Sequence, residues 1–192
     1  MPMQRTGLRP AADRQRVRPE ERPDRMPSIR LIRIDDDLRL IVEEATDDFG
    51  KAYGASMGES RQLIQEVVSQ TLALLMKVPR APEWGGYLVN DDEQAVVIGT
   101  CGFTHGPEAD ASVEIAYFTF PGFEGRGYAT AMARELLNLT LQSGTVRKVI
   151  AHTLPERNAS TRVLEKVGLQ LVGEAHDAEV GKVWLWAYRP GV

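Results

Sequence analysis

A loop with two glycines, Gly125-Arg126-Gly127, lies between a strand pattern and a helix pattern. Residues 112–120 alternate as a strand does, and residues 128–142 carry apolar side chains at helical spacing. Two glycines let the backbone come close to a ligand. The free N–H groups and the positive dipole end of the following helix attract anions, and Arg126 adds a positive charge. A plain strand-to-helix turn has the same pattern, so an anion site and a simple turn both remain open.

Spacing excludes the two best-known phosphate loops. A P-loop needs G-x-x-x-x-G-K-[ST], which is absent from the sequence. A dinucleotide-binding loop needs a third glycine where Thr130 stands, and an acidic residue about 20 positions later. The next predicted strand ends instead in Ala-His-Thr at 151–153. The 67 residues that follow Gly125 in this chain of 192 are also too few for a complete dinucleotide fold.

Hydrophobic periodicity predicts the order β-α-α-β-β-β-α-β-α-β-β. The central β-α-β unit requires one parallel pair of strands, and the predicted hairpins require antiparallel pairs. The fold class is therefore α/β (α+β), with a mixed, mostly antiparallel sheet and helices on both faces. The predicted strands are 29–34, 86–89, 95–103, 112–120, 146–153, 169–173 and 180–188; the predicted helices are 36–53, 59–77, 128–142 and 158–167.

The composition divides the chain near residue 28. Residues 1–27 are rich in Arg and Pro and contain few large apolar side chains, so we expect a disordered N-terminal extension. Residues 28–192 are long enough for one domain with a sizeable core. The extension has seven Arg and four acidic residues, which leaves a net charge of −7 on the rest of a chain of net charge −4.

This charge distribution and the cysteine content narrow the function classes. An acidic body argues against a nucleic-acid-binding domain, and it favours a cationic acceptor such as an amine, although ordinary surface charge explains it equally well. No apolar stretch approaches the roughly 20 residues of a membrane span. Cys101 is the only cysteine, so we expect no disulfide, no zinc cluster or other metal site, and a reducing, cytoplasmic location.

Two stretches within residues 84–173 have a distinctive sequence. The first is Glu-Ile-Ala-Tyr at 114–117 with Pro-Gly-Phe-Glu-Gly-Arg-Gly-Tyr-Ala-Thr at 121–130; the second is Ala-His-Thr-Leu-Pro-Glu at 151–156 with Asn-Ala-Ser-Thr-Arg-Val-Leu-Glu-Lys-Val-Gly at 158–168. Together they resemble the GNAT superfamily of N-acetyltransferases, most closely the subgroup that includes the N-terminal acetyltransferases of ribosomal proteins. The resemblance implies a GNAT-like acyl-CoA N-acyltransferase fold that uses acetyl-CoA as co-substrate.

The resemblance also implies which residues hold the cofactor. Gly127 and Ala129 match the family motif [Gln/Arg]-x-x-Gly-x-[Gly/Ala], whereas Glu124 stands at its Gln/Arg position and would repel a pyrophosphate unless it points away or pairs with a cation. The backbone at Thr119 corresponds to the segment that bonds pantetheine. Asn158 and Ser160, at the start of the later helix, are further candidates, but Asn and Ser are also residue types that favour N-cap positions. The full set of candidates is Thr119, Gly125, Arg126, Gly127, Tyr128, Ala129, Thr130, Asn158 and Ser160.

Amine acylation needs a base, and Glu114 is the best candidate. It lies on the same face of its strand as two Phe side chains, and apolar surroundings would raise its pKa. Family members often carry Glu at this position; a salt bridge to a neighbouring strand is the alternative explanation. His152 and His105 are weaker candidates.

Many relatives have a general-acid Tyr where this chain has Leu164. Tyr117 or Tyr128, or a proton from water or from the amine itself, could replace it.

The predicted reaction is direct transfer of acetyl from acetyl-CoA to a primary amine, either a protein N-terminus or a small amine. The alternative is a catalytically silent acyl-CoA-binding regulatory module. We expect Cys101 to lie in the core, and Trp184 and Trp186 to pack in the last strand or to line the acceptor pocket. Acceptor specificity would come from residues 36–82 and from a predicted loop at 174–179.

Overall fold

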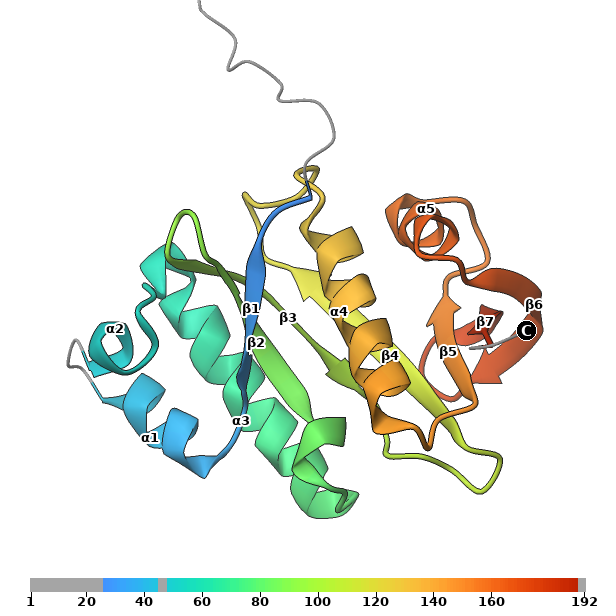
Figure 1. The fold of residues 1–192 in the computed structure, drawn as a ribbon, viewed down its shortest axis with the longest axis horizontal. Coiled ribbons are helices and arrows are strands. Elements are labelled where there is room, and N and C mark those ends of the chain that lie inside the picture. Colours follow the sequence, from blue (N-terminus) through green and yellow to red (C-terminus); the bar gives the residue numbers. More distant parts are fainter. Residues whose placement is uncertain (1–25, 45–47, 190–192) are drawn as a thin grey trace, which may run out of the picture.

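The computed structural model describes residues 26–44 and 48–189, which form one seven-stranded sheet in the order β1-β2-β3-β4-β5-β7-β6 (Figure 1). Only β4 and β5 pair in parallel; the other neighbours are antiparallel, so the predicted mixed sheet is confirmed. The predicted disordered extension, apart from residues 26 and 27, lies outside the described residues. The strands are β1 (Ile29–Arg33), β2 (Gly86–Asp91), β3 (Val96–Phe103), β4 (Ser112–Thr119), β5 (Lys148–Thr153), β6 (Gln170–Asp177) and β7 (Gly181–Tyr188).

Helices cover both faces of the sheet. Leu88 and Val89 are neighbours on β2 but belong to different hydrophobic clusters, because successive strand residues point to opposite faces. The N-terminal helices pack on the face of Leu88, whereas α4 and α5 pack on the face of Val89. The helices are α1 (Asp36–Glu43), α2 (Asp48–Tyr53), α3 (Arg61–Lys77), α4 (Tyr128–Ser143) and α5 (Ala159–Lys166), with short 3-10 turns at Gly58–Ser60 and Pro82–Trp84. No helix within the described ranges is long and apolar enough to cross a membrane.

Two predictions differ from the structure by more than two residues. The single helix at 36–53 is two helices, α1 and α2, separated by residues 44–47. The predicted loop at 174–179 belongs largely to a hairpin, because β6 continues to Asp177. The Asp177 carboxylate accepts the amides of Glu179 and Val180, which closes a tight turn before β7. Most of β6 is solvent-exposed, so its sequence lacks the alternation that marks a half-buried strand.

The parallel ladder between β4 and β5 is short. It joins Ser112–Glu114 to Lys148–Ile150, although β4 runs on to Thr119 and β5 to Thr153. Figure 1 shows the two strands diverging beyond this point. The Glu114 carbonyl accepts the amide of Thr104, directly after β3, and the Phe120 amide donates to Ile98 of β3. Because N–H and C=O groups alternate sides along a strand, those of the odd-numbered residues 115–119 point into the gap.

A buried network fixes the start of α4 against the β2–β3 turn. The Tyr128 hydroxyl donates to the Asp91 carboxylate, and the Gln94 side-chain amide donates to both, at 2.7 and 2.8 Å. Burial alone would raise the pKa of Asp91, but hydrogen bonds from Tyr128 and Gln94 outweigh this and hold the pKa below its usual value. Burial and the bond to Asp91 raise the pKa of Tyr128 to about 12.

We expect Tyr128→Phe to lower the free energy of unfolding by about 1–3 kcal/mol at neutral pH, because it removes a donor to a buried carboxylate. The difference from wild type should shrink in acid. The Asp91 pKa is lower in the folded protein, so its stabilisation is present above the usual Asp pKa of about 3.9 and disappears as pH falls through the folded-state value. Urea unfolding at several pH values measures this.

Tyr188→Phe is the matched control for this variant. Tyr188 is half-buried, and its hydroxyl has no hydrogen-bond partner within the described residues. Equal stability losses in the two variants at every pH would show that the Tyr128–Asp91 bond contributes nothing specific.

Candidate active site

The first cavity lies between α4, α5 and the end of β4, and we call it the α4–α5 cavity. Its volume is about 430 Å³. The loop before α4 forms one wall, the first two turns of α5 form another, and the divergent end of β4 forms the floor. Its lining residues are Tyr117, Phe118, Thr119, Phe123, Glu124, Gly125, Gly127, Tyr128, Ala129, Thr130, Ala159, Ser160, Arg162, Val163 and Lys166.

The glycine loop gives this cavity an exposed backbone. Gly125 and Gly127 have φ values of +75° and +87°, a region where other residues are strained, and Gly127 is the N-cap of α4. The Glu124 carboxylate accepts the amide of Gly122 at 2.7 Å and so is held against its own loop. The Arg126 guanidinium lies over the Phe123 ring, 5.6 Å from its centroid, and Arg126 does not line the cavity.

Two cations that the sequence analysis did not single out line this cavity. Arg162 and Lys166 are four residues apart and therefore share one face of α5. The sequence contained a signal for them: Arg162 and Lys166 follow Ala159 and Val163 at spacings of three residues, which places them on the same side of the helix. Together with the first-turn amides of α4, they give the cavity the donors and positive charge that bind phosphate.

The two candidates at the start of α5 have different positions. The Asn158 side chain accepts the Thr161 amide at 3.1 Å, and the Thr161 hydroxyl accepts the Asn158 amide, which forms a capping box. Asn158 therefore serves as an N-cap, and it is absent from the lining of the cavity. Ser160 does line the cavity, beside Ala159.

A second cavity lies on the opposite face of the sheet, and we call it the α3–β4 cavity. Its volume is about 230 Å³. It shares Tyr117 and Phe118 with the α4–α5 cavity, so the two cavities meet at β4 beyond the end of the β4–β5 ladder. The lining residues are Thr71, Leu74, Arg80, Gly86, Thr100, Cys101, Gly102, Phe103, Thr104, Ala116, Tyr117 and Phe118.

Glu114 stands at the point where the ladder ends. Its carboxylate accepts the Thr104 hydroxyl at 2.8 Å, and its other oxygen lies 2.6 Å from Nδ1 of His152 on β5. Both side chains are partly exposed, 20% for Glu114 and 30% for His152. The expected apolar surroundings are therefore replaced by two polar partners. The sequence analysis named Glu114 and His152 as separate candidates, and the fold brings them together as one pair.

The remaining polar candidates lie away from this pair. His105 contacts the Gly106 carbonyl through Nδ1 and lies 3.7 Å from Glu108. The Tyr117 hydroxyl faces the first turn of α5, 3.4 Å from the Ser160 carbonyl, and burial raises the pKa of Tyr117. Cys101 is buried, and its burial raises the pKa of the thiol. No group of three or more potential metal-ligating side chains occurs within the residues that the structure describes.

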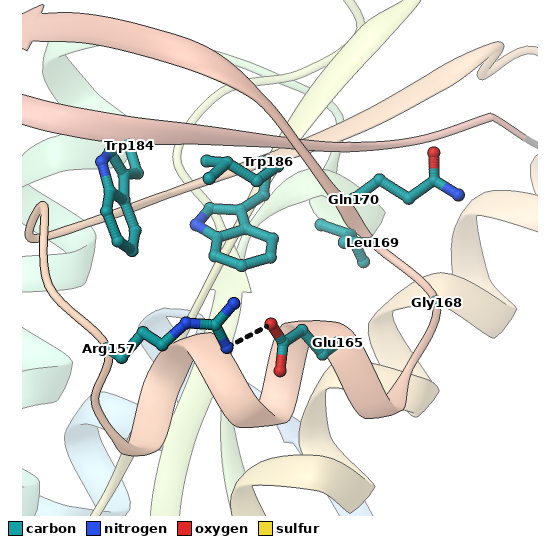
Figure 2. Close-up of a pocket in the computed structure, with 8 residues that line it drawn as sticks. Arg157, Glu165, Gly168, Leu169, Gln170, Trp184 and Trp186 are labelled. Atoms are coloured by element: carbon teal, nitrogen blue, oxygen red, sulfur yellow. Dashed lines mark hydrogen bonds and ion pairs between the residues drawn. The ribbon is translucent and has the colours of Figure 1, made fainter.

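The two tryptophans belong to a different part of the molecule. Trp186 is buried, and its indole N–H donates to the Thr153 hydroxyl at 3.0 Å. Figure 2 shows Trp184 and Trp186 facing α5, above the Arg157–Glu165 ion pair of 3.1 Å. These side chains line a third cavity, under the β6–β7 hairpin, which shares no residue with the two cavities that meet at β4.

Comparisons with known proteins place this geometry in a family. The model of the acetyltransferase (GNAT) domain matches residues 28–170. The uncharacterized N-acetyltransferase YoaA of Bacillus subtilis is 25% identical over 147 residues, 70% of this chain and 81% of that protein. YjdG of the same organism is 23% identical over 121 residues, 63% of this chain and 70% of that protein.

A solved structure shares the same fold. The ribosomal-protein-S5-alanine acetyltransferase of Vibrio fischeri superposes with a TM-score of 0.57 at 16% identity, covering 85% of this chain and 92% of that one. The family model spans most of this chain, from the start of β1 to the start of β6, and includes both cavities and the Glu114–His152 pair. The chain therefore belongs to the GNAT acetyltransferase family.

Proposed function

We propose that this acetyltransferase binds acetyl-CoA in the α4–α5 cavity and transfers the acetyl group directly to a primary amine in the α3–β4 cavity. The observation that carries the proposal is that the two cavities share Tyr117 and Phe118, on β4 beyond Glu114. A thioester in one cavity and an amine in the other would come together there without a covalent acyl-enzyme. The buried Cys101 thiol, with its raised pKa, is a poor nucleophile and supports direct transfer.

The residues of the α4–α5 cavity fit a CoA pyrophosphate and pantetheine. In the proposal, the amides from Gly127 to Thr130 hold the phosphates, and Arg162 and Lys166 add positive charge. The backbone groups at Thr119 point into the gap and would pair with the amides of pantetheine. Bound acetyl-CoA supplies a thioester carbonyl, and a backbone N–H in the same gap would polarise it.

Glu114 and His152 are proposed to accept the proton from the attacking amine. Thr104 orients the carboxylate, and the carboxylate in turn orients the imidazole through Nδ1. Amine attack forms the C–N bond and breaks the C–S bond, so one proton must leave nitrogen and the thiolate must gain one. Tyr117 is the proposed donor to the thiolate, because the residue lines both cavities and its raised pKa keeps it protonated at neutral pH.

Two acceptor classes remain consistent with this site. Structural neighbours include the ribosomal L7/L12 α-N-protein acetyltransferase RimL and a chimera of the spermidine N-acetyltransferase SpeG, at 16% identity each. The first modifies a protein N-terminus and the second a small amine. We propose a primary amine as acceptor, presented to Glu114 and His152 by the walls of the α3–β4 cavity.

We expect CoA to raise the melting temperature of the wild-type protein, because a ligand that binds only the folded state stabilises it. Gly127→Val should abolish this shift, since a side chain at φ +87° strains the N-cap and displaces the amides from the cavity. Thermal unfolding with and without millimolar CoA measures the effect. Gly181→Val is the control, because Gly181 also has positive φ but lies in the distant β6–β7 turn. An unchanged wild-type melting temperature with CoA contradicts the cofactor assignment.

We expect Glu114→Gln to lower kcat roughly a hundredfold or more at neutral pH, the usual scale for loss of a general base. CoA affinity should be unchanged, since Glu114 does not line the α4–α5 cavity. The loss should shrink at high pH, where more of the amine is already deprotonated. Free-thiol release from acetyl-CoA with peptide amines gives the rates. Glu43→Gln, which removes an exposed carboxylate paired with Arg39, should retain wild-type rates.

Near-wild-type turnover in Glu114→Gln would exclude this role. His152→Asn tests the pair separately: a similar loss with an altered pH profile supports a joint role. In a silent binding module the carboxylate would be dispensable and no amine would release CoA.

A further inference from the structure

Arg80 carries a positive charge that forms no ion pair within the described residues, although Asp35 and Asp36 line a neighbouring cavity with it. It follows α3 and lines the α3–β4 cavity. Its Nη1 donates to the backbone carbonyl of Thr104, while its Nε is buried and has no hydrogen-bond partner. No carboxylate of residues 26–44 or 48–189 lies within ion-pair distance of its guanidinium.

This lone charge dominates the α3–β4 cavity. Of the residues lining that cavity, Arg80 is the only one with a charged side chain; the others are aromatic, aliphatic, Thr, Gly or Cys. A partly buried guanidinium without a counter-ion is unfavourable, because it loses hydration and gains no ion pair. Burial lowers the pKa of Arg80, which agrees with this desolvation. A carboxylate entering the cavity would restore the missing partner, with up to two parallel hydrogen bonds.

A single residue separates this cation from the proposed base. The Thr104 carbonyl accepts from Arg80, and the Thr104 hydroxyl donates to Glu114, which contacts His152. Glu114 does not line the cavity, but Thr104 does, so a molecule there can direct a carboxylate to Arg80 and an amine toward Glu114 on the far side of Thr104. At about 230 Å³ the cavity is smaller than the roughly 300–1,000 Å³ pockets that enclose drug-sized ligands, so it admits only the reacting end of an acceptor.

We propose that Arg80 is the acceptor-specificity residue, and that the preferred substrates are primary amines that carry a carboxylate within about one residue of the reacting nitrogen. This class includes free amino acids and peptides with an acidic side chain near the N-terminus; polyamines are excluded from it. The inference rests on the proposed function, since it takes the α3–β4 cavity as the acceptor site.

The test compares acceptors that differ only in one carboxylate. Ser-Glu-Ala-amide and Ser-Gln-Ala-amide form the peptide pair, and free serine and serinamide form the amino-acid pair. We expect the wild-type enzyme to prefer the acceptor with the carboxylate in at least one pair, by about tenfold or more in kcat/KM. The pair that shows the preference identifies whether an acidic side chain or an α-carboxylate is recognised. In Arg80→Gln this preference should fall to about one, with the loss in KM for the acidic acceptor. Arg80→Lys should retain part of it, because it keeps the charge but loses the bidentate geometry.

Arg33→Gln is the matched control. Arg33 lines a neighbouring cavity together with Arg80 but does not line the α3–β4 cavity, so its loss should leave the preference unchanged. Equal losses of kcat/KM for acidic and neutral acceptors in Arg80→Gln would show that Arg80 only ties the Thr104 carbonyl to the end of α3. That result, or a wild type without any carboxylate preference, overturns the proposal.

Equilibrium binding separates this proposal from the proposed reaction. The same four acceptors are titrated into the CoA complex of wild type and Arg80→Gln by calorimetry. A carboxylate preference in binding that depends on Arg80 supports the specificity site even if no amine is acetylated, and absent turnover then overturns only the reaction. Acetylation of the neutral acceptors without a carboxylate preference in binding overturns the specificity site and leaves the reaction in place.

Discussion

The early end of the parallel ladder between β4 and β5 determines where every other part of the site can lie. Backbone N–H and C=O groups inside a sheet normally form hydrogen bonds with the neighbouring strand. Because pairing stops at Glu114 and Ile150, the backbone groups of the odd-numbered residues 115–119 point into an open gap. The cavities on the two faces of the sheet share Tyr117 and Phe118, the β4 residues that border this gap.

A gap of this kind needs rigid walls, and α4 supplies one. The helix begins at the left-handed Gly127 and ends at the left-handed Gly144, so both of its ends are defined by glycines. Its first residue is held by the buried bond from Tyr128 to Asp91, while Met132 and Leu136 are completely buried against the sheet. The Tyr128 hydroxyl therefore has a structural role at the start of the helix. Tyr117 is the tyrosine that lines both cavities.

The sequence predicted the central part of the fold because local and long-range signals agree there. Alternation in 112–120, the two glycines and the helical spacing of 128–142 all specify one β-α-β unit, and α4 follows it to within one residue. Prediction failed where a feature depends on tertiary contacts that local sequence patterns do not encode. Most of β6 is exposed and lacks an apolar stripe, and the pairing of Glu114 with His152 joins strands 38 positions apart. The sequence predicted that Asn158 could serve as an N-cap. It could not predict that the Asn158 side chain would lie outside the cavity, because that depends on how α5 packs.

Charge shows most clearly why local geometry outweighs composition. The acidic body suggested a cationic acceptor, yet the only charged side chain lining the α3–β4 cavity is Arg80, and the cations lining the α4–α5 cavity are Arg162 and Lys166. Exposed acids are screened within about 10 Å at ordinary ionic strength, whereas a partly buried guanidinium is screened less and acts more strongly on a group beside it. In the proposed site the acceptor would therefore interact directly with Arg80 and Glu114, and the net charge of the protein would govern only its approach.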